Sequence, residues 1–86
     1  MSEIKLEMLE EQVLSIICRI TGMESKEITR DGHLYQDFGI DSIKAIELLV
    51  SIQEKFNIRV DDSKVQNLIT VAVIAEEIKR LLEKKK

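Results

Sequence analysis

The residues best placed to do chemistry lie in the run Asp37-Phe38-Gly39-Ile40-Asp41-Ser42-Ile43, which leads into a strongly apolar stretch. Ser42 falls at the expected first turn of a helix, behind a turn that contains Gly39. A serine there is exposed, and the positive end of the helix dipole favours a phosphate beside it. The pattern suits a serine that receives a phosphate-linked group better than one that attacks a substrate. Simple capping of the helix is the alternative, structural interpretation.

The other polar residues give little support for independent catalysis or metal binding. His33 is the only histidine and Cys18 the only cysteine. A nucleophilic serine needs a base and an orienting group, so a small hydrolase using Ser42 with His33 is the weakest hypothesis. One His and one Cys give no ligand cluster, and the acidic pairs lack calcium-loop spacing. We expect no catalytic residue and no metal site, with Cys18 buried or half-buried.

Apolar residues recur at helical spacing in three long segments, and no useful length alternates with a period of two. They predict a first helix over about residues 3–20, a second from Asp41 or Ser42 to about Phe56, and a last one capped by Thr70. A short helical piece over about residues 61–68 precedes the last helix. Residues 21–41 lack periodicity but contain apolar anchors, so we expect a long loop packed against the core.

The expected fold is therefore all-α, a small four-helix bundle of three longer helices and one short helix, in a single domain over residues 1–86. The second helix is more apolar than one amphipathic face requires, so we expect it to be central. Its two neighbouring apolar stripes are Ala45, Leu49, Ile52 and Phe56, and Ile43, Ile46 and Val50. A narrow polar stripe begins beside Ser42 and is the candidate docking surface: Lys44, Glu47, Ser51 and Glu54.

The formal charge of −3 is spread unevenly. Residues 31–66 carry four basic and seven acidic groups, whereas residues 67–86 carry five basic and three acidic ones. The acidic middle favours a basic partner, and the lack of a basic stripe with interleaved aromatics argues against nucleic acid. No apolar run approaches the ~20 residues of a membrane span, and acids interrupt the N-terminal segment. We expect no membrane association and no signal peptide, and a cytoplasmic monomer.

The run Gly39-Ile40-Asp41-Ser42-Ile43, with the helix behind it that ends at Phe56, resembles the attachment site of an acyl carrier protein. The resemblance extends from about Leu9 to Leu81 and includes the first helix. It also includes these parts of the chain: the long loop with Leu34, the Asp37-Phe38-Gly39 approach, Ile58, Val60 and Leu68-Ile69-Thr70-Val71.

The resemblance implies a carrier with no catalytic activity of its own. In this family a phosphopantetheinyl transferase moves 4′-phosphopantetheine from coenzyme A onto the motif serine, here Ser42, and acyl groups then travel as thioesters on this arm. By the same match, Asp41 would help the transferase recognise the site, and Ile43 would contact partners beside the arm. Glu47 and Glu54 would present acids to acyl-loading and acyl-using enzymes with basic docking surfaces.

Two residue sets follow from this resemblance. The set expected to bind partners is Lys44, Glu47, Ser51, Glu54 and Asp62. The set expected to line the region where some carriers shelter an acyl chain is Ile46, Val50, Ile52, Val60, Val65 and Leu68.

Departures from the family pattern bear on the pathway. Phe38 and Ile43 stand where leucine is usual or commoner, and Asp61 replaces a common proline. Positions that are often acidic in carriers of bacterial fatty acid synthesis hold Lys44, Ser63 and Gln66. Because exposed charges set partner choice, these changes favour a specialised acyl, polyketide or aminoacyl carrier. An unmodified helical adaptor that kept the carrier fold is the alternative from a different class.

Overall fold

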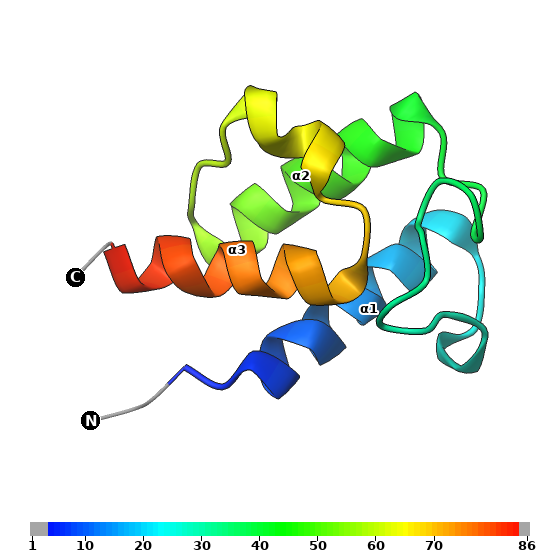
Figure 1. The fold of residues 1–86 in the computed structure, drawn as a ribbon, viewed down its shortest axis with the longest axis horizontal. Coiled ribbons are helices and arrows are strands. Elements are labelled where there is room, and N and C mark those ends of the chain that lie inside the picture. The colour runs from blue at the N-terminus through cyan, green and yellow to red at the C-terminus, as the bar shows by residue number, and fades with distance from the viewer. Residues whose placement is uncertain (1–3, 85–86) are drawn as a thin grey trace.

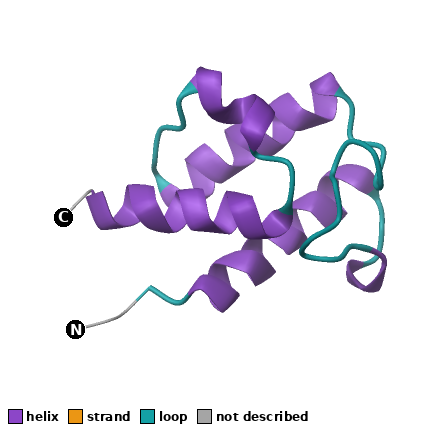
Figure 2. Cartoon of the chain, viewed as in Figure 1, coloured by secondary structure: helices purple, strands orange, loops and turns teal. Residues whose placement is uncertain are grey.

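The computed structural model describes residues 4–84, with the side chains of Asp62, Val65 and Gln66 outside the described part. Its elements are the α-helices α1 (Leu6–Thr21), α2 (Ser42–Phe56) and α3 (Val71–Lys84), and the 3₁₀ helices η1 (Ser25–Glu27) and η2 (Asp62–Asn67). No strand occurs in residues 4–84, in agreement with the all-α prediction (Figure 2). α1 packs against both α2 and α3, and α2 begins at the end of the molecule far from the C-terminal end of α3 (Figure 1).

α1 follows the apolar stripe that predicted it. Its buried residues are Leu9, Val13, Ile16 and Ile17. Gly22 ends the helix in the left-handed conformation at φ 78°, and its N–H donates to the carbonyl of Cys18 at 2.8 Å. Cys18 is half-buried against the core, as expected. The expected start near residue 3 lies outside the described residues.

The predicted bounds of α2 are confirmed, but the expectation that α2 is the central helix is wrong, because α1 is the helix that packs against both of the others. Ile52 is buried and Ala45 and Phe56 pack against the core, as the first stripe predicts. The second stripe is exposed, with Ile43 at 68%, Ile46 at 61% and Val50 at 43%. Leu48, which belongs to neither stripe, is buried instead. The buried residues of α2 are therefore Leu48 and Ile52, on a helix that packs against α1.

The long loop between α1 and α2 is packed against the core, as its apolar anchors predict. Ile28, Leu34 and Ile40 are buried. Two backbone hydrogen bonds join the loop to the beginning of α3: the N–H of Leu34 donates to the carbonyl of Ile69 at 2.8 Å, and the N–H of Ala72 donates to the carbonyl of Arg30 at 3.1 Å. These two hydrogen bonds hold the loop that precedes Ser42 against residues 69–72, which are distant in sequence.

The expected short fourth helix is present as η2, which has 3₁₀ geometry, and η1 was not predicted. Six residues supply too few α-type hydrogen bonds to offset nucleation, and 3₁₀ geometry is common in such connections. Thr70 caps α3 as predicted, its Oγ1 accepting from the N–H of Val73 at 3.1 Å. The buried face of α3 is Val71, Ala72, Ile74, Ala75 and Ile78, and the expected Leu81 and Leu82 are half-buried.

Candidate functional site

Asp41 caps the start of α2 and places Ser42 as the first helical residue. The backbone of Asp41 is extended, with φ −92° and ψ −178°. Its Oδ1 accepts from the N–H of Lys44 at 2.9 Å, and its carbonyl accepts from the N–H of Ala45 at 2.9 Å. The predicted cap is therefore confirmed, and the aspartate rather than the serine provides it. This division of roles leaves the hydroxyl of Ser42 available for another purpose.

The approach to Ser42 is fixed on its N-terminal side. Gly39 adopts φ 67°, a conformation that glycine reaches without strain. Ile40 follows it and is buried, and its N–H donates to the carbonyl of Leu34 at 3.1 Å. Ser42 thus emerges from a turn whose preceding side chain is anchored in the core, while Ser42 itself is exposed.

His33 forms hydrogen bonds within its own turn, and none to Ser42 is found in the described residues. Its Nδ1 accepts from the N–H of Gln36 at 3.1 Å, and its backbone N–H donates to Oδ2 of Asp37 at 2.8 Å. The carbonyl of His33 in turn accepts from the N–H of Asp37 at 2.7 Å. Among the described residues, none forms a hydrogen bond with the hydroxyl of Ser42. His33 is therefore a residue of its own turn, and the geometry of a catalytic triad is missing from this part of the chain.

The start of α2 fits a phosphate ester on Ser42. The hydroxyl is exposed, and the first N–H groups of a 15-residue helix lie beside it with the positive end of the dipole. The nearest carboxylate, that of Asp41, uses one oxygen for the cap. A negatively charged group on the Ser42 oxygen would thus meet a favourable field and room in solvent.

The outward face of α2 differs from the predicted polar stripe. Glu47 and Glu54 are exposed, but Lys44 and Ser51 are half-buried. The hydroxyl of Ser51 accepts from Nη2 of Arg19 at 3.2 Å, so this side chain is turned toward α1. The residues that α2 presents to solvent beside Ser42, called the docking face below, are Ile43, Ile46, Glu47, Val50 and Glu54.

The residues expected around an acyl chain differ in exposure where the structure describes them. Ile52 and Val60 are buried, Leu68 is half-buried, and Ile46 and Val50 are on the surface. The side chains of Val65 and of the expected partner-binding residue Asp62 lie outside the described part. Val50 and Val60 do line a common open hollow of about 880 Å³, called the connector hollow below, with Gln53, Glu54, Asn57, Ile58, Arg59 and Asp61.

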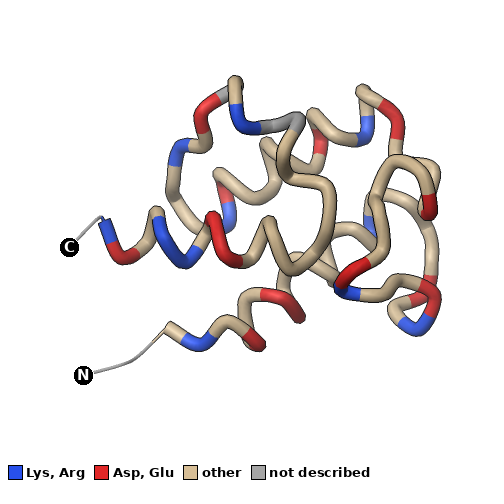
Figure 3. Tube along the Cα trace, in the orientation of Figure 1, with Lys and Arg blue, Asp and Glu red and all other residues tan. Residues whose placement is uncertain are grey.

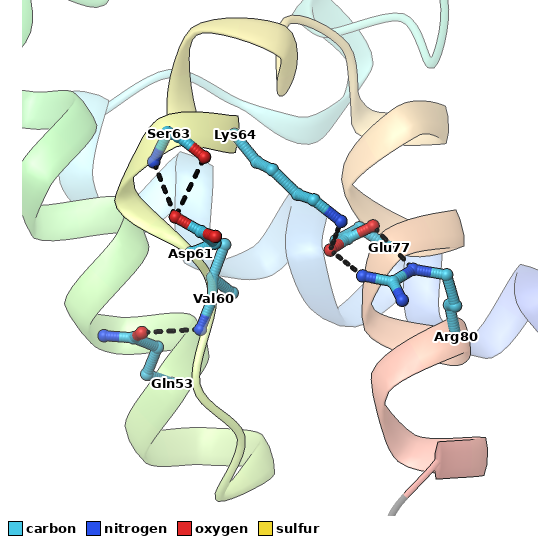
Figure 4. Close-up of polar contacts among 7 residues, drawn as sticks. All are labelled: Gln53, Val60, Asp61, Ser63, Lys64, Glu77 and Arg80. Atoms are coloured by element: carbon cyan, nitrogen blue, oxygen red, sulfur yellow. Dashed lines mark hydrogen bonds and ion pairs between the residues drawn. The ribbon is translucent and has the colours of Figure 1, made fainter.

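Gln53 is a residue of this region that the sequence did not indicate. Its Oε1 accepts from the N–H of Val60 at 2.8 Å and so joins α2 to the connector that follows it (Figure 4). A side chain that bonds a backbone group seven residues away leaves no periodic signal in the sequence.

Charged contacts join η2 to α3. Oε2 of Glu77 lies 3.6 Å from Nζ of Lys64 and 2.6 Å from Nη2 of Arg80, which ties η2 to α3 (Figure 4). Hydrogen bonds from Arg80 hold the pKa of Glu77 below its usual value. Figure 3 shows Lys and Arg interleaved with Glu along α3. Lys85 and Lys86, on which the predicted basic character of residues 67–86 depends, lie outside the described residues.

Further findings concern other kinds of site. The described residues contain no group of three or more His, Cys, Asp and Glu side chains that could hold a metal ion. Each helix between residues 4 and 84 is too short or too polar to cross a membrane.

Comparison with known proteins gives consistent matches. The model of the family described as "Phosphopantetheine attachment site" matches residues 11–78. An acyl carrier protein of Akkermansia muciniphila is 36% identical over 73 residues, covering 85% of this chain and 91% of the relative. One of Buchnera aphidicola subsp. Baizongia pistaciae is 32% identical over 72 residues, covering 84% and 92%.

The fold also matches a solved structure. The HMG-ACPI domain of the CurA module from Lyngbya majuscula superposes with a TM-score of 0.86 at 20% identity, covering 100% of this chain and 87% of that domain. This match shows that the fold is shared with a solved carrier domain. The chain belongs to the acyl carrier protein family, whose covalently bound cofactor is 4′-phosphopantetheine.

Proposed function

We propose that this chain is a cytoplasmic, monomeric carrier of acyl groups and that Ser42 is its point of attachment for 4′-phosphopantetheine. The observation that carries the proposal is the exposed hydroxyl of Ser42 at the capped start of α2, with no hydrogen-bond partner among the described residues. Ser42 is also the serine of the motif that resembles the family's attachment site.

Each neighbouring residue has a separate role in this proposal. Asp41 holds the first turn of α2, so the Ser42 oxygen keeps a fixed position and direction. The N-terminal N–H groups of α2 favour the negative charge of the phosphodiester. When bound, the arm supplies a terminal thiol on which acyl groups are held as thioesters. The compact domain then raises the local concentration of the cargo at any enzyme that binds the carrier.

The docking face is proposed to contact the phosphopantetheinyl transferase and the acyl-loading and acyl-using enzymes. The docking face has three exposed apolar residues on the helix that begins at Ser42, namely Ile43, Ile46 and Val50. A group of exposed apolar residues marks an interaction surface, whereas single exposed apolar residues are common. Glu47 and Glu54 border this area with negative charge, which suits basic partner surfaces. Lys44 and Asp61 depart from the charge pattern of fatty acid carriers, and they favour a specialised acyl, polyketide or aminoacyl pathway.

The test is covalent modification by a broad-specificity phosphopantetheinyl transferase with coenzyme A, followed by intact mass and fragmentation. We expect one phosphopantetheine group on the wild-type chain, none on Ser42→Ala, and one on the control Ser15→Ala, which removes an exposed hydroxyl from α1. Modification of Ser42→Ala would overturn the assignment of Ser42. If the wild-type chain stays unmodified here and in its native host, the unmodified adaptor becomes the better reading.

A further inference from the structure

Gln53 accepts hydrogen bonds from three backbone N–H groups of the connector, the segment between α2 and η2. Its carbonyl accepts from the N–H of Asn57 and from the N–H of Ile58, the latter at 3.2 Å. Its side-chain Oε1 accepts from the N–H of Val60 at 2.8 Å (Figure 4). The first two bonds belong to the backbone and would form with any residue at position 53. The bond from Val60 needs a side chain at position 53 that is as long as glutamine and ends in a hydrogen-bond acceptor.

The bond to Val60 is important because Val60 is 4% exposed. A backbone N–H at a buried residue that loses its acceptor carries a desolvation penalty, and the chain then moves to find another partner or water. The neighbouring residue that would move with Val60 is Asp61. Asp61 is itself ordered, since its Oδ1 accepts from the N–H and the hydroxyl of Ser63, both at 2.9 Å.

The connector hollow lies against the docking face, because Val50 and Glu54 belong to both. Val50 gives it exposed apolar surface, and Glu54 and Asp61 contribute carboxylates from α2 and from the connector. Arg59 also lines it, but Arg59 borders the neighbouring hollow with Leu81 and Lys84 as well. Two carboxylates against one guanidinium leave the lining negative. A long basic side chain suits such a hollow, with its methylene stem on apolar surface and its charge at the carboxylates.

We propose that Gln53 is a positioning residue of the partner-docking surface: by holding Val60, it keeps Asp61 in the same hollow as Glu54, and this hollow receives one lysine or arginine side chain of the partner enzyme. The proposal rests on the proposed carrier function. It adds a second wall, formed by the connector, to the surface that α2 presents, and it assigns a role to the aspartate that replaces the family's common proline.

The first measurement is amide hydrogen exchange of the unmodified protein at Val60. We expect Gln53→Ala to speed exchange at this amide by at least about tenfold. Gln53→Glu should restore slow exchange, because a carboxylate oxygen at the same distance accepts the same bond. The control is Gln12→Ala, which truncates a half-buried glutamine on α1 that lines a different hollow. Unchanged exchange in Gln53→Ala would refute the holding role.

The second measurement is the rate of modification by a phosphopantetheinyl transferase as a function of carrier concentration. We expect Gln53→Ala to raise KM by about threefold with kcat unchanged, and Gln12→Ala to match the wild type. Gln53→Glu should not raise KM, because it keeps the acceptor for Val60 and adds a carboxylate to the hollow. Asp61→Asn should raise KM similarly and show no further rise when combined with Gln53→Ala. Faster exchange with an unchanged KM in both Gln53→Ala and Asp61→Asn would overturn the docking role of the hollow.

These outcomes differ from a failure of the carrier function itself, which would leave the wild-type chain unmodified at any concentration. Circular dichroism checks that each variant is folded. If Gln53→Ala does not fold, Asp61→Asn still tests the hollow, since its change is confined to an exposed side chain.

Discussion

The aromatic ring of Phe38 lies directly against the backbone of Gly32. A Cβ atom on Gly32 would sit 2.5 Å from Cζ and 2.6 Å from Cε2 of this ring, and 2.7 Å from Oγ1 of Thr29. These distances are too short for real contacts of a Cβ atom, so any side chain at position 32 requires the Phe38 ring, the Thr29 side chain or the loop to shift. Phe38 stands where the family usually has leucine, and the contact shows how the loop accommodates the larger ring.

We therefore expect Gly32→Ala to destabilise the protein by about 1–3 kcal/mol, because the added methyl group forces the ring or the loop to move. Urea unfolding followed by circular dichroism measures the change. Phe38→Leu in the same chain should recover part of the loss, since it removes the atoms that clash. Strictly additive effects of the two substitutions would contradict this contact.

The cap on α2 predicts different outcomes for two substitutions of Asp41. Asp41→Ala removes the acceptor of the Lys44 N–H and should cost about 1 kcal/mol of unfolding free energy, whereas Asp41→Asn should cost a few tenths at most. The same pair separates capping from recognition in the transferase assay. If modification of Asp41→Asn falls as far as that of Asp41→Ala, the transferase reads the charge of Asp41 and not the helix geometry.

Two isoleucines on the same helix should respond very differently to truncation. Ile52→Ala should lower the unfolding free energy by about 2–5 kcal/mol, because Ile52 is 2% exposed and a cavity would remain. Ile46→Ala should change it by less than about 0.5 kcal/mol, because Ile46 projects into solvent. In the transferase assay, Ile46→Ala should raise KM. A large loss of stability for Ile46→Ala would mean that the second apolar stripe is buried after all.

Charge reversal on the docking face tests its electrostatic part. Glu47→Lys should slow transfer to partner enzymes at low salt and leave the fold intact, because Glu47 is exposed. The effect should shrink as added salt screens the interaction. Glu83→Lys, an identical charge change at an exposed position on α3, is the matched control. Equal transfer rates for the wild type and Glu47→Lys at low salt would remove Glu47 from the docking face.

The ion pair between Glu10 and Arg30 predicts how stability depends on pH. Hydrogen bonds from Arg30, at 3.0 Å and 2.7 Å, hold the pKa of Glu10 below its ordinary value of 4.5. A carboxyl with a lowered pKa stabilises the folded state above its ordinary pKa, and this contribution disappears as the pH falls through the folded value. Wild type should therefore exceed Glu10→Gln in thermal stability near neutral pH, with the gap closing below about pH 4.5. A gap that persists at low pH would assign the effect to packing.

The sequence was sufficient where a local signal dominates. The bounds of α2, the cap by Asp41, the cap by Thr70 and the stop at Gly22 each depend on a few neighbouring residues, and all four are confirmed. The loop between α1 and α2 was predicted to pack against the core from its spaced apolar residues, which is also confirmed. The four helix-end features depend on hydrogen bonds between residues that lie close in sequence, whereas the loop was recognised from its apolar composition.

The sequence was insufficient where tertiary packing decides. α2 is apolar around much of its circumference, so periodicity could not tell which apolar residues are buried. Leu48 belongs to neither predicted stripe and is buried, whereas Ile46 and Val50 are exposed. Ser51 was placed on the outward stripe, but it bonds Arg19 of another helix. The bond from Val60 to Gln53 has no local pattern at all. These three features depend on which elements meet in space, and the sequence states that only indirectly.

The two backbone hydrogen bonds between the long loop and the beginning of α3 also have a consequence for the dynamics of the attachment site. Leu34 cannot leave its place without breaking its bond to Ile69, and Ile40 depends on Leu34 in turn. The turn before Ser42 and the first turn of α3 should therefore open together, as one cooperative unit. The local stability of the backbone around Ser42 therefore depends on residues 69–72 at the beginning of α3, which are remote from Ser42 in sequence.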